Sequence, residues 1–196
     1  MNALVGINQL PDLEDTVDSF HAVIDFWFNE IDNKQWFVKD LQFDQLIIER
    51  FSDLHAKAIC CELYLWRQQP LGRLAEIIVL DQFSRNMFRD KAEAFASDAL
   101  ALVLAQEAIS HGAGKQLSPL QQAFLYMPFM HSESKLIHNI AVELFSAPGL
   151  EDNHKFELKH KEIIDRFGRY PHRNVILGRQ SSKDEVEFLK QPNSGF

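Results

Sequence analysis

The chain has 196 residues, a size that fits one ordinary domain and buries a substantial core. Its formal net charge of −8 argues against binding nucleic acid or an anionic membrane through a generally positive surface, although a local cationic pocket remains allowed. Sixteen Phe and 46% hydrophobic residues predict a bulky globular core. We expect one domain over residues 1–196, with an irregular lead-in over 1–15 and a loose tail over 190–196.

The first predicted helix covers residues 17–28, where apolar side chains recur at helical spacing. Asp15 or Thr16 is suited to cap its N-terminus, because a short oxygen-bearing side chain satisfies free backbone N–H groups. A polar turn ends the helix. We expect Trp36 and Phe37 to fill the core from this turn.

The second predicted helix begins at Asp40, and its apolar pattern continues to Leu65. The two cysteines, Cys60 and Cys61, lie inside this pattern. Neighbouring cysteines rarely bridge well and their spacing fits no metal site, so we expect buried free thiols in a reducing compartment. No basic-then-apolar N-terminal signal and no apolar run long enough to span a bilayer are present. We therefore expect a cytoplasmic protein.

The central helix is predicted to begin after Pro70, although Gly72 weakens its first turn. Polar residues then lead to a helix over 99–110, for which Ser97 or Asp98 is a good cap. Two glycines end that helix. The alternation of caps and stops indicates short connections between helices.

The pair Ser118-Pro119 is a specific start signal, a cap followed by proline at the first helical position. We expect this helix to run to about Tyr126. Pro128 removes a backbone donor and disfavours helix at Met127, so it should break or kink the chain there. The residues that follow would then be free of helix geometry.

The C-terminal part is predicted to contain three more helices. One covers 136–145, one is capped by Asp152 or Asn153 and ends at Gly168, and a short last helix opens with the capping-box pattern 182–185. No stretch shows the alternation of a β-strand. The predicted fold is therefore all-α, built from helical hairpins with no β-sheet.

The stretch 74–89 is apolar in its first half and polar in its second. Its polar residues are Asp81, Gln82, Arg85, Asn86 and Arg89. On one helix, Asp81 and Arg85 lie four residues apart and face each other. Because a buried charge needs a partner, we expect Asp81 to contact Arg85 or an arginine of 166–173. A functional site and a buried ion-pair cluster that fixes helix register are equally compatible with this pattern.

A second polar stretch spans 166–179 and contains no acid. Its candidate binding residues are Arg166, Arg169, Arg173, Asn174 and Arg179, and His172 is a candidate proton-transfer residue. Guanidinium groups suit carboxylates and phosphates, and loops on a rigid scaffold often carry function. These arginines need partners from elsewhere, namely Asp81, Glu133 or a ligand. The alternative is that they cap helix C-termini and hold the tail in place.

The segment His131-Ser132-Glu133 follows the expected break. His131 is a candidate general acid or base because its reference pKa lies near neutrality, although a structural hydrogen bond is the commoner role of such a histidine. A His-x-Glu pair occurs in zinc deaminases, but the Pro-Cys-x-x-Cys that it requires is absent. His154 and His160 lie on a charged helix, and we expect both to be solvated.

The sequence contains no Gly-rich phosphate loop, no Gly-x-Ser-x-Gly elbow and no His-Glu-x-x-His motif. We therefore predict no cofactor and no metal site.

Three motifs, "LAEIIVLDQFSRNMFRD…AFASD", "FLYMPFMHSE" and "RFGRYPHRNVILGR", resemble in this order an uncharacterised, mainly bacterial family called domain of unknown function nine-two-four. The early "DFWF" and "WF" fit the same family, and the resemblance covers residues 20–190. It implies an all-helical fold whose hairpins form a tetratricopeptide-like (TPR-like) right-handed array. The resemblance implies no particular activity.

The resemblance also carries over a set of polar positions. They are Asp81, Gln82, Arg85, Asn86, Arg89, His131, Ser132, Glu133, Arg166, Arg169, His172, Arg173, Asn174 and Arg179. Two departures stand out. Ser84 replaces the family's usual proline, so the central helix is free to run on, and Gln180 stands where the family often has glutamate.

Two functions follow as alternatives. In the first, Arg85, Arg169 and Arg173 hold a small anionic molecule in one pocket with His131, and His131, Glu133 or His172 transfers protons. In the second, a helical-repeat module binds a peptide or protein on its concave face without catalysis. A closed pocket with several arginines favours the first function, and a long open groove lined by exposed aromatic residues favours the second. Neither function involves nucleic acid or a membrane.

Overall fold

The structure is a computed structural model that describes residues 19–192 and 194–195, and these contain helices and no strand. The all-α prediction is confirmed. The cap predicted at Asp15 or Thr16 lies outside the described residues. None of the helices in the described part of the chain is long and apolar enough to cross a membrane.

The first described helix, α2 (Ser19–Asp25), passes directly into the π-helical turn η2 (Phe26–Glu30), and the 3₁₀ turn η3 (Asn33–Phe37) follows. Trp36 in that turn packs against the core, as predicted. Phe37 does not, because its side chain is 70% exposed. The 3₁₀ turn directs one of two neighbouring side chains inwards and the other outwards.

The next helix, α3 (Leu41–Ile59), begins at Asp40, whose carboxylate accepts hydrogen bonds from two backbone N–H groups of the first turn. It ends six residues before the predicted Leu65. The chain then turns at Cys61, which has a positive φ of 59°, and enters the 3₁₀ turn η4 (Tyr64–Gln68). Both cysteines are free and exposed, so the prediction of buried thiols is wrong. They lie in the turn rather than on the buried face of a helix.

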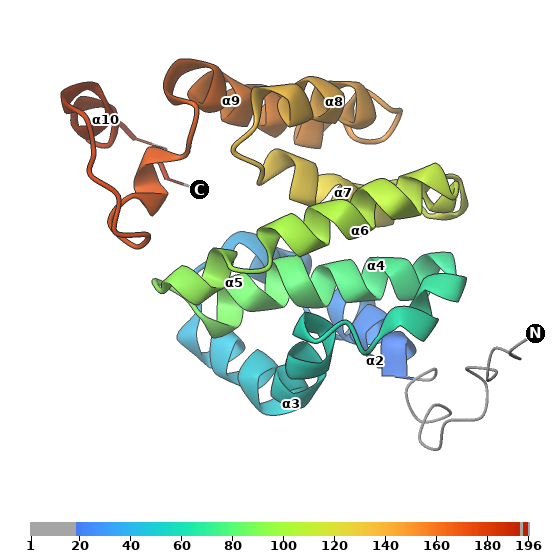
Figure 1. The fold of residues 1–196 in the computed structure, drawn as a ribbon. Coiled ribbons are helices and arrows are strands. Elements are labelled where there is room, and N and C mark those ends of the chain that lie inside the picture. Colours follow the sequence, from blue (N-terminus) through green and yellow to red (C-terminus); the bar gives the residue numbers. More distant parts are fainter. Residues whose placement is uncertain (1–18, 193, 196) are drawn as a thin grey trace, which may run out of the picture.

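The central helical stretch is unbroken from α4 (Pro70–Ile78) through the π-helical turn η5 (Val79–Phe83) into α5 (Ser84–Met87). Residues 74–84 are buried without exception. In Figure 1 this stretch crosses the middle of the molecule, with α2 and α3 below it and α6 above it. The run-on expected from Ser84 is confirmed.

Above the central stretch, the 3₁₀ turn η6 (Ala92–Phe95) leads into α6 (Asp98–Ser110), and η7 (Ala113–Gln116) leads into α7 (Pro119–Met130). Ser118 and Gln121 form the capping box of α7.

The expected break at Pro128 is absent, because Pro128 lies inside α7. The His131 N–H still donates to the Met127 carbonyl, so the helical pattern continues past the proline. Pro128 lies in the last turn of α7 and removes one backbone donor there, and the buried side chains on both sides of it keep the helix in place. The segment from His131 therefore starts directly from a helix end.

The upper layer contains α8 (Lys135–Phe145), α9 (Glu151–Phe167), the 3₁₀ turn η8 (Pro171–Arg173) and α10 (Lys183–Phe188). Neither Asp152 nor Asn153 caps α9, which starts at Glu151 without a side-chain cap. Gly168 ends α9 at a φ of 70°, and Ser182 forms the predicted capping box of α10. Successive helices from α6 to α9 pack against each other.

The core is aromatic, as the number of Phe residues predicted. Phe26 and Phe51 have ring centroids 4.9 Å apart, and Trp27 meets the Phe124 ring edge-on at 5.6 Å. A smaller apolar cluster around Ile164 and Tyr170 joins α9 to the C-terminal segment.

Candidate functional site

The polar site begins with a pair formed by Asp81 on η5 and His131 at the end of α7. The His131 Nδ1 atom lies 2.7 Å from Asp81 Oδ1. Asp81 is 1% exposed and the His131 side chain 17%. The π-helical turn places Asp81 against the helix end that carries His131, because α4 and α7 pack together. The predicted contact between Asp81 and Arg85 is also confirmed, with an Nη1–Oδ1 distance of 3.1 Å.

The surroundings of this pair fix its protonation. Burial opposes a charge on Asp81, but Arg85 and the hydrogen bonds from His131 and Gln82 outweigh burial and hold the pKa of the carboxyl below its ordinary value. Burial, followed by the positive charge of Arg85, lowers the pKa of His131. Asp81 is therefore ionised and His131 is neutral at pH 7. In this state His131 Nδ1–H donates to Asp81, and Nε2 keeps its lone pair.

Asp98, the first residue of α6, connects two arginines that are far apart in sequence. It accepts hydrogen bonds from Arg85 Nη1 and Nη2, at 2.9 and 3.1 Å, and from Arg173 Nη1 at 3.2 Å. We call Asp81, Arg85, Asp98, His131 and Arg173 together the Asp98 cluster. Its two carboxylates and two guanidinium groups balance in charge.

Arg173 is held rigidly within the Asp98 cluster. Its guanidinium carbon lies 4.6 Å from the ring centroid of Phe95 and 4.6 Å from that of Tyr170. Such contacts with aromatic faces stabilise a cation where water is scarce. Its Nε atom is buried without a hydrogen-bond partner among the described residues, and no hydrogen bond to them is present at Nη2. Donor capacity therefore remains on a side chain that is only 6% exposed.

The loop after α9 is anchored by Glu133. Its carboxylate accepts two hydrogen bonds from Arg179, at 2.5 and 2.9 Å, and one from the Tyr170 N–H. Arg179 Nε also donates to Asn174, which in turn donates to Ser181. The prediction that Glu133 partners an arginine of this stretch is confirmed. Glu133 thus holds the loop against the end of α7, and its own oxygens are occupied.

A buried hydrogen-bond network lies behind the Asp98 cluster. The Tyr170 hydroxyl donates to the Met130 carbonyl at 2.5 Å and lies 3.2 Å from His138 Nε2. That nitrogen also lies 2.8 Å from the Ser132 carbonyl, and His138 Nδ1 lies 2.7 Å from Glu157. Burial raises the pKa of Glu157, although His138 opposes the shift. The network fixes the backbone of the segment that follows His131.

Two further histidines lie beside Tyr170. The rings of His160 and His172 have centroids 5.8 and 5.6 Å from the Tyr170 ring. Burial lowers the pKa of His160 to about 3 and that of His172 to about 4. The prediction that His160 is solvated is wrong, because α9 packs this face against Tyr170. His172 Nδ1 is buried without a hydrogen-bond partner among the described residues.

The other predicted site residues on the central stretch have different partners. Gln82 donates to Asp81 at 2.5 Å. Asn86 and Arg89 both donate to Asp44 of α3, Arg89 through Nε and Nη2 at 2.5 and 2.6 Å. This second buried ion pair holds α5 against α3 and lies apart from the contacts of His131.

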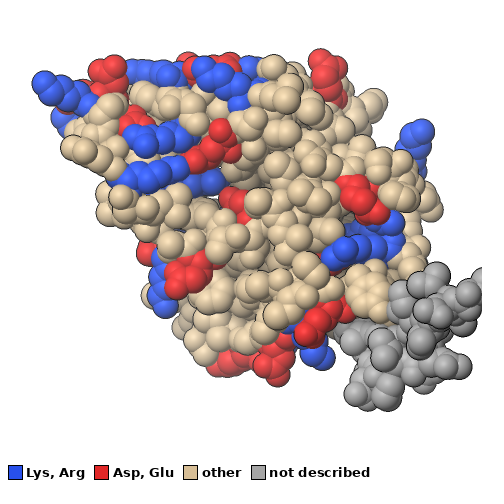
Figure 2. Space-filling model, viewed as in Figure 1, with Lys and Arg blue, Asp and Glu red and all other residues tan. Residues whose placement is uncertain are grey.

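The C-terminal arginines divide in the same way. Arg169 donates two hydrogen bonds to Glu185 of α10 and one to the Gln180 carbonyl, and no contact joins it to Arg85 or Arg173 among the described residues. Arg166 is exposed and lies over the Phe167 ring. Figure 2 shows that basic and acidic side chains alternate over this upper part of the molecule.

Sequence reasoning missed three members of the site. Asp98 was predicted to be a helix cap, but its side chain binds arginine instead of backbone. Phe95 and Tyr170 were not assigned any role. The sequence did contain a signal for a further acidic residue. Two buried arginines, Arg85 and Arg173, need more than the one carboxylate that Asp81 supplies. No group of three or more His, Cys, Asp or Glu is placed to hold a metal in the part of the chain that the structure describes.

Comparisons with known proteins add the following. A family model described as "Bacterial protein of unknown function (DUF924)" matches residues 23–193. A solved structure of a protein of unknown function, ATU0120 from Agrobacterium tumefaciens, is 36% identical, covers 90% of this chain and 99% of its own, and superposes with a TM-score of 0.85. No curated protein matches the chain.

Proposed function

Because the chain belongs to the bacterial family of proteins of unknown function DUF924, whose description includes no activity, we propose a function from the site itself. The Asp98 cluster binds a small anionic molecule that carries a carboxylate or phosphate group. His131 exchanges a proton with the bound molecule, which makes the cluster a candidate enzyme active site. Arg85 and Arg173 are the binding residues, and Asp81 is the positioning residue for His131.

The observation that supports this proposal most strongly is the Asp81–His131 pair beside two guanidinium groups. A buried carboxylate that receives Nδ1–H leaves Nε2 as a proton acceptor in a fixed orientation, as in many general bases. The His131 Nε2 atom makes no hydrogen bond to any described residue. A histidine that takes up and releases a proton, in the same cluster as unused arginine donors, suits a substrate that is both anionic and able to exchange a proton.

The charge balance of the cluster predicts how binding proceeds. The two arginines already face two carboxylates, so an added anion leaves the site negative unless a proton enters with it. The lowered pKa of His131 and that of His172, about 4, should both rise when an anion lies nearby. Binding should therefore be accompanied by proton uptake.

The test measures the melting temperature with phosphate, sulfate and a panel of small carboxylates at constant ionic strength. Binding to the folded state alone raises stability by about 2.7 kcal/mol at a hundredfold excess over the dissociation constant. Arg173→Lys and Arg85→Lys keep the charge but lose the planar fork, and they should reduce the shift. Arg169→Lys is the matched control, since Arg169 also makes a paired contact with a carboxylate, outside the cluster.

Titration calorimetry in buffers of different ionisation enthalpy then measures the proton uptake. The proposal fails if every anion raises the melting temperature of the parent and of the Arg85 and Arg173 variants equally. It also fails if Arg169→Lys reduces this rise as much as the cluster variants do. It also fails if binding occurs without proton uptake. His131→Gln should bind the anion but take up less proton, which separates the role of the histidine from that of the arginines.

For the arrangement of the helices, we propose the TPR-like right-handed array that the family resemblance implies. The support is that α6, α7, α8 and α9 each pack against the next helix in the chain. An experimental structure tests this through the sense of rotation between successive hairpins. A left-handed or irregular rotation would contradict it.

A further inference from the structure

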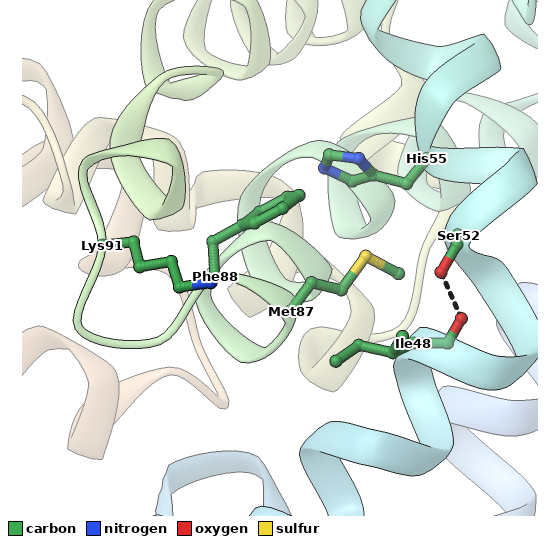
Figure 3. A pocket seen from close by; sticks show the side chains of 6 residues that line it. All are labelled: Ile48, Ser52, His55, Met87, Phe88 and Lys91. Atoms are coloured by element: carbon green, nitrogen blue, oxygen red, sulfur yellow. Dashed lines mark hydrogen bonds between the residues drawn. The ribbon is translucent and has the colours of Figure 1, made fainter.

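A cavity with a volume of about 190 Å³ lies between α3 and the end of α5, on the side of the central stretch that faces away from α6. It is lined by Ile48, Ser52, His55, Met87, Phe88 and Lys91. Figure 3 shows the His55 and Phe88 rings bordering one space, with the Met87 thioether below them. None of these residues belongs to the Asp98 cluster. An apolar cavity of about 150 Å³ is large enough for benzene, so this one has room for a substituted single ring.

His55 is the titratable residue in this lining that is nearly buried, with a relative exposure of 3%. His55 Nε2 lies 2.7 Å from the Ser84 hydroxyl oxygen, and that hydroxyl donates to the Leu80 carbonyl at 2.6 Å. A hydroxyl has only one proton, so its oxygen must accept from His55 Nε2–H. Burial lowers the pKa of His55 and keeps the ring neutral. Nδ1 therefore holds a lone pair.

No described residue satisfies this acceptor. The His55 ring is held by one hydrogen bond at Nε2 and by the Phe88 ring, whose centroid lies 5.4 Å away. Nδ1 has no hydrogen-bond partner in the described part of the chain, and it is not sealed from solvent. Water can reach this nitrogen, and a ligand that brings a hydrogen-bond donor would take the place of that water.

The rest of the lining limits the chemistry of the ligand further. Ile48, Met87 and Phe88 supply apolar and aromatic contact. The Ser52 hydroxyl donates to the Ile48 carbonyl and offers no free proton. Lys91 is exposed and forms no ion pair with any described residue, so its charge is available at the edge of the cavity.

We propose that this cavity is a binding site for a single-ring aromatic acid that carries a hydroxyl or N–H donor. The ring packs against Phe88 and Met87, the donor bonds to His55 Nδ1, and the carboxylate lies near Lys91. A hydroxybenzoate is the simplest molecule with all three features. This site is independent of the anion site proposed above, although both accept carboxylates.

The first test requires no variant. Nitrogen-15 spectra of the histidine side chains should show His55 as the Nε2–H tautomer with an unprotonated Nδ1. Adding 3-hydroxybenzoate or 4-hydroxybenzoate should move the Nδ1 resonance of His55. A ring found in the Nδ1–H form would overturn the proposal, because its nitrogen would then be a donor.

The second test compares affinities by calorimetry. Benzoate lacks the hydroxyl and should bind roughly tenfold more weakly than the better hydroxybenzoate, the loss expected when one hydrogen bond is missing. Lys91→Gln should weaken hydroxybenzoate binding by about twofold to fivefold, as for an exposed ion pair. Lys57→Gln is the matched control. Lys57 of α3 is exposed, as Lys91 is, but it does not line the cavity.

Arg173→Lys separates the two sites. It should leave the movement of the His55 resonance unchanged even if it abolishes binding at the Asp98 cluster. The proposal is overturned if hydroxybenzoate and benzoate bind equally, if Lys57→Gln and Lys91→Gln have equal effects, or if Arg173→Lys removes the response at His55.

Discussion

At the scale of single residues, charge pairing decides the structure of both polar stretches. Arg85, Arg89, Arg169, Arg173 and Arg179 each contact a carboxylate. The need for such partners was predictable, because buried guanidinium groups require them. Only Asp81 and Glu133 were named correctly from the sequence. Asp44, Asp98 and Glu185 could not be assigned, since their pairing depends on how helices far apart in sequence pack.

The Asp81 carboxylate should contribute strongly to stability. Asp81→Ala leaves Arg85 and His131 without their shared partner, and we expect a loss of about 3–5 kcal/mol at pH 7. The pKa of Asp81 is lowered in the folded state, so its contribution is complete above the unfolded pKa. The contribution declines as the pH falls below that value towards the folded pKa.

Urea denaturation of the parent and of Asp81→Ala between pH 7 and pH 3 measures this effect. The difference between the two proteins should be largest at neutral pH and smaller in acid. Asp165→Ala removes an exposed ion pair with Lys161 and should cost far less at every pH. A near-zero cost for Asp81→Ala would mean that the carboxylate is not a buried partner of Arg85.

At the scale of elements, helices were predictable where local chemistry determines them. Asp40, Ser118 and Ser182 cap helices as predicted, because each side chain bonds to backbone within its own turn. Pro128 was misread because tertiary burial of its neighbours outweighs the loss of one backbone donor. The π-helical turns also have no local signal, and η5 is the turn that carries Asp81.

Gly72 in α4 shows how a close contact reverses a local rule. In an exposed helix, replacing Gly by Ala stabilises by up to about 1 kcal/mol. Here a Cβ atom at position 72 would lie 2.1 Å from the Trp66 carbonyl oxygen. We therefore expect Gly72→Ala to destabilise, by roughly 1–3 kcal/mol or more, since backbone atoms must move.

Thermal denaturation of Gly72→Ala measures the sign directly. Ser110→Ala, at the exposed end of α6, is a suitable control with an expected change within about 0.5 kcal/mol. A stabilised Gly72→Ala protein would show that α4 and η4 do not approach as closely as the structure has them.

At the scale of the whole molecule, the all-helical class followed from the helical spacing of the apolar residues. It also followed from the capping residues, glycines and prolines that begin and end helices. The candidate site did not, because its residues come from η5, α5, α6, the end of α7 and η8. These elements meet through packing of the aromatic core and of the smaller apolar cluster around Tyr170, and through the Glu133–Arg179 contact. Sequence motifs identified most of the polar residues but not which of them touch.

Glu133→Gln tests how the C-terminal segment is held. The amide keeps the size of Glu133 but loses the charge that faces Arg179 at 2.5 and 2.9 Å. We expect unchanged helix content by circular dichroism and faster amide exchange over 168–181. Lys155→Gln breaks an exposed pair with Asp152 and should leave exchange in that loop unchanged. Equal exchange in Glu133→Gln and the parent would assign the anchoring to the apolar contacts of Tyr170 alone.

The contact between Arg173 and Asp98 has a consequence for the order in which the protein matures on the ribosome. The two residues are 75 positions apart. At a synthesis rate of about 5–20 residues per second, Arg173 is made roughly 4–15 s after Asp98. During that interval Arg85 is the partner available to Asp98 within the cluster. The Arg85–Asp98 pair can therefore form before Arg173 has been synthesised, and the Asp98 cluster is complete only once residue 173 has been added.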